Sequence, residues 1–163
     1  MKKSLILALA VIALLFAGCG KNSNLQEKSM ELQEMQDRAG IRSLADRYAL
    51  MSDQYNQEGY REIFSKDLNL RIIAGENITE IHGVDDMVRI YKAAGAAKVS
   101  FHQVGQQVVE FDDATHAHGT TYLTALLGND EVAQMFIRYE DKFEKTDGRW
   151  QITDRDQIIV YRK

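Results

Sequence analysis

Hydrophobic residues in the first half of the chain recur every three or four positions, which is the spacing of an amphipathic helix. The clearest such helix begins at Ile41, and its apolar positions are Ile41, Leu44, Ala45, Tyr48, Met51 and Tyr55. The same spacing predicts a second helix over residues 59–67 and a third over residues 84–94, ended by Gly95. Residues 25–39 carry a thinner apolar stripe, and we interpret them as a spacer helix that Gly40 weakens.

The second half of the chain alternates between hydrophobic and polar residues, which is the period of a β-strand. Residues 68–73 and 78–83 are predicted to form a hairpin before the third helix. Four long strands are predicted after that helix, over residues 99–111, 117–127, 132–145 and 150–161. Strands of this length must bend, and Gly105 and Gly119 are the expected positions of bulges. Helices followed by consecutive long strands predict an α+β domain with an antiparallel sheet.

The beginning of the chain has the layout of a secretory signal. Lys2 and Lys3 precede an apolar run, Leu5 to Ala17, that is shorter than the ~20 residues of a membrane-spanning helix. The stretch LLFAGC, which ends at Cys19, resembles the lipobox of bacterial lipoproteins, in which the cysteine is lipidated and becomes the mature N-terminus. The alternative is an ordinary secretory signal with an accidental cysteine, but Cys19 is the only cysteine of the chain. We therefore expect a signal peptide over residues 1–18, a lipidated tether and spacer helix over 19–40, and a folded domain over 41–163.

Acyl chains such as palmitate on Cys19 would anchor the protein to a membrane. By the resemblance to lipoproteins, Gly20 rather than Asp after the cysteine implies the outer membrane in a host that has one, with the domain facing the periplasm. Loss of Lys2 and Lys3 leaves 18 Lys and Arg against 24 Asp and Glu, a net charge of −6. An acidic chain without basic runs argues against nucleic acid as a partner.

The order and spacing of the predicted elements resemble the SnoaL-like domains of the nuclear transport factor 2-like superfamily. The resemblance is carried by IRSLADRYALMSDQYNQEGYREIF, IHGVDDMVRIY, SFHQVGQQVVEFDDATHAHGTTYLTAL and IRYEDKFEKTDGRWQITDR, within residues 41–163. It implies a cone: a strongly curved mixed or antiparallel sheet wrapped around a pocket, with three N-terminal helices closing it. It also implies a dimer or higher oligomer that packs through the sheet, and we expect a homodimer.

Family enzymes that dehydrate or isomerise cyclic substrates place a Tyr, an Asp and a His in the cone. The resemblance implies these roles for Tyr48, Asp53 and His102. On a regular helix five residues turn through about 500°, so Asp53 lies about 140° from Tyr48. Both side chains can face one cavity only if the helix ends or distorts near Ser52, or if Asp53 lies on the rim of the cavity. A His–Asp pair could then move a proton while the tyrosine hydrogen-bonds a developing oxyanion.

The family pattern is incomplete in this chain. The asparagine that often follows the family histidine is replaced by Gly105 and Gln106, and the second acidic residue of the steroid dehydratase relatives is not evident. The site residues also have purely structural interpretations: Asp53 as a solvated helix-end charge, His102 as a hydrogen-bonded core histidine, and Tyr48 as a core residue.

Four residues are candidates for contact with a ligand: Tyr48, His102, Tyr122 and Arg138. Arg138 and Arg155 are also interpreted as salt-bridged surface residues of strands. His116 and His118 project to one face of a strand, as a metal site needs, but no third ligand is evident beyond His82 or His102, and we expect no metal.

Two classes of function remain. No nucleotide-binding or serine-hydrolase motif occurs, and no cofactor is expected. The membrane tether and the incomplete polar set favour a non-catalytic lipoprotein that binds a small hydrophobic molecule in its cone. The alternative is a cofactor-independent dehydratase or isomerase of a cyclic, polyketide-like or steroid-like substrate that uses the Asp-His-Tyr set. Whether the protein is an enzyme therefore stays open at this point.

Overall fold

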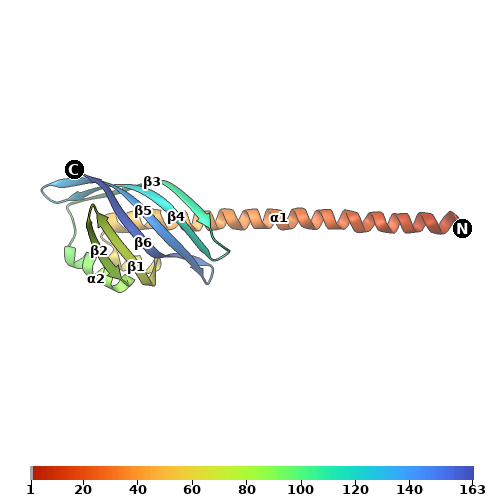
Figure 1. Cartoon of the computed structure of the whole chain (residues 1–163), viewed down its shortest axis with the longest axis horizontal. Coiled ribbons are helices and arrows are strands. Elements are labelled where there is room, and N and C mark those ends of the chain that lie inside the picture. The colour runs from red at the N-terminus through yellow and green to blue at the C-terminus, as the bar shows by residue number, and fades with distance from the viewer. Residues whose placement is uncertain (1) are drawn as a thin grey trace. The chain divides into compact units, whose positions relative to one another are not determined.

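Residues 2–163 fold into two α-helices, one 3-10 helix and six strands (Figure 1). The computed structural model describes the backbone of residues 2–163 and the side chains of residues 24–163. The elements are α1 (Lys2–Asp53), η1 (Gln57–Glu62), β1 (Phe64–Ala74), β2 (Asn77–His82), α2 (Val84–Ala94), β3 (Val99–Phe111), β4 (His116–Gly128), β5 (Val132–Thr146) and β6 (Arg149–Arg162). The chain divides into two units, Met1–Asp37 and Arg38–Lys163.

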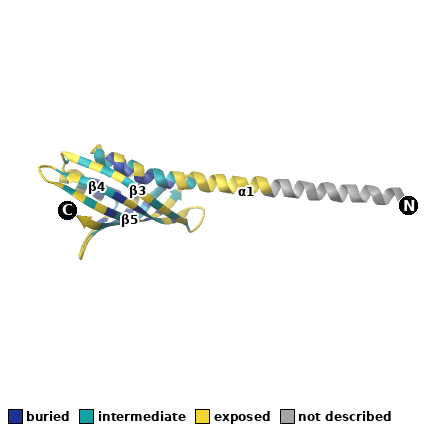
Figure 2. Ribbon diagram, turned by 90° about the horizontal axis from the view of Figure 1, so that it is seen from above, coloured by how far each residue is buried: buried dark blue, intermediate teal, exposed yellow. Residues whose placement is uncertain are grey.

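The first unit is the N-terminal part of α1. Among its described side chains, the large apolar ones are exposed, as the yellow segment of α1 in Figure 2 shows. They are Leu25, Met30, Leu32 and Met35. Gly40 does not interrupt α1, so the expected spacer helix and the helix from Ile41 are one element. A Cβ at Gly40 would lie 3.2 Å from Trp150 Cδ1, so close packing accounts for the glycine.

The second unit is built on one six-stranded sheet in the order β2-β1-β6-β5-β4-β3. The pair β1–β6 is parallel and the other four pairs are antiparallel, so the sheet is mixed. Figure 1 shows the long strands curving as they cross the domain. The four strands predicted after α2 are all present, and α2 has the predicted bounds. The predicted α+β fold class is confirmed.

Bulges shift the register of the long strands. In β3 the shift lies between Val104 and Gln107, as expected at Gly105. Gly119 lies in a regular ladder, where a Cβ would collide with the carbonyl oxygen of Val108. Close approach of β3, rather than a bulge, explains that glycine.

The predicted helix over residues 59–67 is wrong. The structure has the short helix η1, whose cap Asn56 accepts the Gly59 N–H at 3.2 Å, and then β1 from Phe64. Phe64 pairs with Ile152 of β6, and both side chains are fully buried. Strand pairing and burial outweigh the local helical spacing here.

The core of the second unit joins the end of α1 to one face of the sheet. The predicted helical stripe supplies Ile41, Leu44, Tyr48 and Met51 to a buried cluster that also contains Ile137 and Tyr139 of β5. We call the sheet face that carries this cluster the inner face. Trp150 of β6 belongs to the same buried cluster and is 6 % exposed.

Strand β3 is an edge strand whose free side is covered by α1. Three side chains of α1 hydrogen-bond its backbone. Arg38 Nη1 donates to Val109 O at 2.9 Å, Arg42 Nη1 donates to Gly105 O at 2.8 Å, and Asp53 Oδ2 accepts the His102 N–H at 3.0 Å. The helix thus satisfies backbone groups that an unpaired edge would leave to solvent.

Candidate active site

A cavity of about 480 Å³ opens on the inner face of the sheet. The C-terminal end of α1, η1, α2 and strands β3 to β6 all contribute residues to its wall. Its polar lining includes Tyr48, Ser52, Asp53, Gln57, Ser100 and His102. The volume is in the range of sites for small organic molecules.

The end of α1 brings Asp53 to the same cavity as Tyr48. The helix ends at Asp53, and the Asn56 N–H donates to Met51 O at 2.8 Å while the Tyr55 N–H donates to Ser52 O at 3.2 Å. These two bonds form a Schellman cap, and Tyr55 takes the left-handed position with φ 55°. A tyrosine at that position is strained relative to glycine, and its hydroxyl donates to Lys92 O at 2.9 Å. The helix end expected near Ser52 is therefore present.

Asp53 and His102 form a hydrogen-bonded pair in the wall of the cavity. Asp53 Oδ1 lies 2.6 Å from His102 Nδ1, and Ser100 Oγ donates to the same oxygen at 3.1 Å. The side chains of Asp53 and His102 are 25 % and 9 % exposed. Because the carboxylate accepts from Nδ1, Nε2 of the neutral ring is left as an acceptor for a ligand. The same bonds fix the plane of the imidazole.

Tyr48 lies at the centre of an aromatic group beside this pair. Its ring stacks on Tyr60 at 5.4 Å between centroids and meets His102 edge-on at 6.3 Å. Burial raises the pKa of Tyr60, and burial raises the pKa of Tyr91 and Tyr139 well above the ordinary value. These hydroxyls therefore stay protonated, and that of Tyr60 is hydrogen-bonded to Ser52 Oγ at 2.9 Å.

A buried ion pair lies behind these rings. Arg155 is 1 % exposed, and its Nε and Nη2 donate to the two oxygens of Asp141 at 2.7 and 2.8 Å. The guanidinium carbon lies 4.0 Å from the ring centroid of Tyr139 and 5.0 Å from that of Tyr48. Burial would lower the pKa of Arg155, but the charge of Asp141 raises it above its ordinary value. The interpretation of Arg155 as a surface residue is wrong.

A bulge in β6 explains why the sequence pattern missed Arg155. Lys142 pairs with Asp154 and Phe143 pairs with Ile152, so Thr153 is an extra residue. Trp150 and Ile152 point to the inner face of the sheet. In a regular strand residue 155 would then point to the outer face, but the extra residue in the bulge turns Arg155 to the inner face.

Tyr122 and Arg138 do not line the cavity, which corrects their expected ligand contact. The inward residues of β4 are the odd-numbered ones, such as Thr121 and Leu123, so Tyr122 faces outward and is 49 % exposed. Arg138, its cross-strand partner, pairs with Glu140 at 3.0 Å on the same outer face. The interpretation of Arg138 as a salt-bridged surface residue is confirmed.

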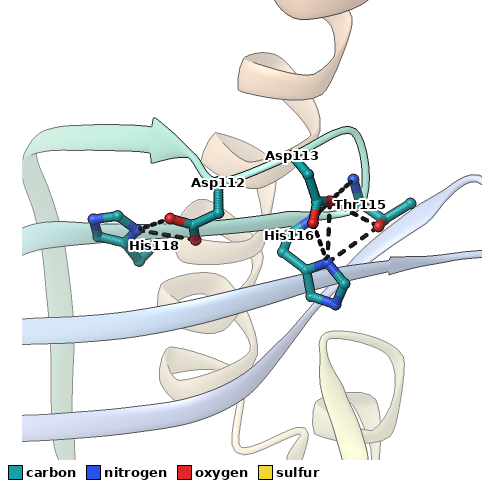
Figure 3. Close-up of polar contacts among 5 residues, drawn as sticks. All are labelled: Asp112, Asp113, Thr115, His116 and His118. Carbon is teal, nitrogen blue, oxygen red and sulfur yellow. Dashed lines mark hydrogen bonds and ion pairs between the residues drawn. The ribbon is translucent and has the colours of Figure 1, made fainter.

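His116 and His118 each pair with an aspartate of the preceding turn (Figure 3). His116 Nδ1 lies 2.9 Å from Asp113 Oδ2, and His118 Nδ1 lies 3.0 Å from Asp112 Oδ1. Asp113 also accepts the backbone N–H of Thr115, and this bond, foremost, lowers its pKa to about 2. Within residues 24–163 no group of three or more His, Cys, Asp or Glu side chains is arranged to hold a metal ion.

The predicted signal peptide and Cys19 lie outside the side chains that the structure describes. Within the described part of the chain, no helix combines the length and the apolar character needed to cross a bilayer.

The fold and the cavity define a class: an α+β cone with an Asp–His pair in its pocket. The sequence profile of the SnoaL-like domain matches residues 33–156, which is most of the chain. The chain therefore belongs to the SnoaL-like domain family, in the nuclear transport factor 2-like superfamily. A search of curated proteins gives no match.

Solved structures with the same fold come from several bacteria. A candidate scytalone dehydratase from Novosphingobium aromaticivorans is 16 % identical, with a TM-score of 0.72 over 80 % of this chain and 89 % of that one. The hexachlorocyclohexane dehydrochlorinase LinA-type3 from Novosphingobium barchaimii is 17 % identical, with a TM-score of 0.70 over 82 % and 92 %. The protein Kfla4162 from Kribbella flavida is 19 % identical, with a TM-score of 0.67 over 80 % and 95 %. At these identities the likeness establishes the fold alone.

Proposed function

We propose that this protein is a cofactor-independent lyase or isomerase that removes a proton from carbon in a small, largely apolar cyclic molecule. The observation that carries the proposal is the 2.6 Å contact between Asp53 Oδ1 and His102 Nδ1 in the wall of the cavity. An imidazole held by a carboxylate, with its second nitrogen available, is the arrangement of a general base.

The chemistry follows from these groups. Nε2 of His102 takes a proton from a carbon next to an activating group, and Asp53 stabilises the imidazolium that forms. In an elimination, the C–H electron pair becomes a carbon–carbon double bond as the bond to the leaving group breaks. A halide departs as the anion, and a hydroxyl group departs as water after it takes the proton from the imidazolium. In an isomerisation, the imidazolium returns the proton to another carbon. The Tyr48 hydroxyl is placed to hydrogen-bond an oxygen that gains negative charge.

The named structural neighbours support an elimination in particular. A dehydratase removes water and a dehydrochlorinase removes hydrogen chloride, and proteins with both names share this fold. Both eliminations begin with loss of a proton from carbon, which is the step that an Asp–His pair serves.

One observation favours the second candidate, a non-catalytic receptor for a hydrophobic molecule. Asp53 also has a structural role, because its Oδ2 accepts a hydrogen bond from the backbone N–H of His102 at the edge of β3. A receptor could keep the pair for that reason alone, and the aromatic wall would supply the affinity.

Native mass spectrometry of the protein from its own host tests for a retained small molecule. That molecule is then the substrate candidate for wild type, Asp53→Asn and His102→Ala. If the protein is an enzyme, both variants should lose turnover while their Kd for the molecule stays within about tenfold of the wild-type value. The reason is that general acid–base groups act mainly on the transition state. If wild type leaves the retained molecule chemically unchanged and exchanges none of its protons with solvent, the enzyme is refuted and the receptor is the supported function.

We further propose that lipidated Cys19 anchors the domain to the outer membrane, facing the periplasm, and that the protein is a homodimer. The exposed apolar residues of the outer sheet face support the dimer; they include Tyr122, Phe136 and Val160. Cys19→Ala should release soluble or unprocessed protein on membrane fractionation. Unchanged tight attachment of that variant would refute the anchor.

A further inference from the structure

A row of four paired residues that begins at His102 runs along the inner face of the sheet, and three of the four line the cavity. The ladder pairs His102 with Ala125, Ala125 with Met135, and Met135 with Arg162. Directly paired residues point to the same face of a sheet. Met135 and Arg162 line the cavity together with His102, so the row crosses the floor of the site from β3 to β6.

A second bulge in β6 turns Arg162 to the inner face of the sheet, where it lines the cavity as an exposed residue. Ile137 pairs with Ile159 but Phe136 pairs with Tyr161, so Val160 is an extra residue in β6. Without it, the alternation that places Ile159 inward would place Tyr161 inward as well and Arg162 outward. Instead, Tyr161 stacks on Phe136 on the outer face, with 5.5 Å between ring centroids.

Arg162 is a cation without a partner in the described part of the chain. It makes no ion pair or side-chain hydrogen bond within residues 24–163. Several arginines at the surface of the domain are paired, as Arg71 is with Asp156 and Arg138 with Glu140, whereas Arg149, which is also unpaired within residues 24–163, does not line the cavity. The other charged residue of the cavity, Asp53, is occupied by His102 and Ser100.

The spacing of the row sets the size of a ligand that reaches both ends. Adjacent strands lie ~4.8 Å apart, so the backbones of His102 and Arg162 are about 14 Å apart along the sheet. Met135 lies between them in the lining, whereas Ala125 is fully buried and is not part of it. The space that remains fits a molecule of one or two rings.

We propose that Arg162 binds a compact anionic group, a carboxylate above all, on a one- or two-ring ligand whose other end lies at His102. The planar guanidinium matches a carboxylate with two parallel hydrogen bonds, which fixes the orientation of the ligand as well as its charge. This assignment deepens the proposed function and rests on it for the use of the cavity. It makes the substrate class a cyclic acid with its reactive C–H remote from the carboxylate.

Binding of matched acids and amides tests the assignment. The probes are benzoate, cinnamate and 2-naphthoate with their neutral primary amides, titrated by calorimetry into the full chain in detergent micelles, with micelles alone as the blank. Arg162→Gln removes the charge and keeps a side chain of similar polarity. Lys163→Gln is the matched control, because it removes the neighbouring charge from a residue outside the cavity lining.

We expect wild type to bind at least one acid, and Arg162→Gln to weaken that acid threefold to tenfold while its amide changes by less than twofold. Arg162→Lys should restore part of the affinity, and Lys163→Gln should change neither probe. Loss of less than threefold, an equal loss for acid and amide, or no acid bound by wild type would overturn the assignment. These measurements need no turnover. A retained molecule that wild type leaves unchanged therefore refutes only the enzyme and not Arg162-dependent binding of the probes, and turnover without Arg162-dependent binding refutes only the anion site.

Discussion

Removal of Asp141 should destabilise the domain more than removal of any surface acid. In Asp141→Ala, the guanidinium of Arg155 stays 1 % exposed but loses both of its hydrogen-bond acceptors. Its Nη1 already has no hydrogen-bond partner among the described residues, so no alternative pairing is at hand. Leaving a buried charge uncompensated costs about 3–5 kcal/mol. At about 4 °C per kcal/mol for a domain of this size, the Tm should fall by about 12–20 °C.

Thermal and urea unfolding of the full chain, followed by circular dichroism and tryptophan fluorescence, measures this cost. Glu140→Ala is the matched control, because Glu140 is the adjacent acid of β5 and pairs with Arg138 on the exposed face. We expect it to change stability by less than about 1 kcal/mol. The double variant Asp141→Leu with Arg155→Met should recover most of the loss, since an apolar pair removes the stranded charge. An Asp141→Ala protein within about 1 kcal/mol of wild type would refute the reasoning that Arg155 remains buried and charged.

Two further predictions concern Trp150, near the start of β6, and Asp113, in the turn between β3 and β4. Trp150→Ala should cost about 3–5 kcal/mol in urea unfolding, because Trp150 is 6 % exposed and its loss leaves a cavity in the core; a loss below about 1 kcal/mol would mean that the site collapses or that the ring is not packed. Asp113 has a pKa lowered to about 2 from an ordinary 3.8, so its bonds contribute stability above about pH 4 that is lost as the pH falls toward 2. The amide chemical shift of Thr115 should titrate with a midpoint near pH 2 by NMR and should lose this step in Asp113→Asn; a midpoint near 4 would contradict the bonding of the turn.

Alternation and helical spacing were sufficient to predict most elements of the fold. The predicted β3 and α2 coincide with the observed ones, because long amphipathic segments carry a strong periodic signal. The failure at residues 59–67 has a tertiary cause. Ile63 and Phe64 fit a helical stripe as well as a strand, and only the parallel pairing with β6, about ninety residues later in sequence, decides between them.

The candidate site was less accessible to sequence reasoning. Tyr48, Asp53 and His102 came from the family resemblance, since periodicity alone places Asp53 away from Tyr48. Two bulges in β6 set the orientation of Arg155 and Arg162, and a one-residue slip reverses every side chain beyond it. The sequence of the strand carries no signal for either bulge, because Thr153 and Val160 are residue types that are common in regular strands.

The covering of β3 by α1 has a consequence for solubility. An uncovered edge strand is a template on which a second chain can add its own strand, which is a common route to aggregates. Here the template is closed by side chains of one helix, and the last of them is Asp53, the carboxylate that also orients His102. Substitutions that free Arg38 and Arg42 from β3 should therefore produce protein that retains its secondary structure but self-associates with time. Asp53 covers the same edge, so a substitution that changes its hydrogen bonds to His102 should also expose backbone groups of β3. Changes in the chemistry of the site and changes in the tendency of the chain to aggregate would therefore occur together.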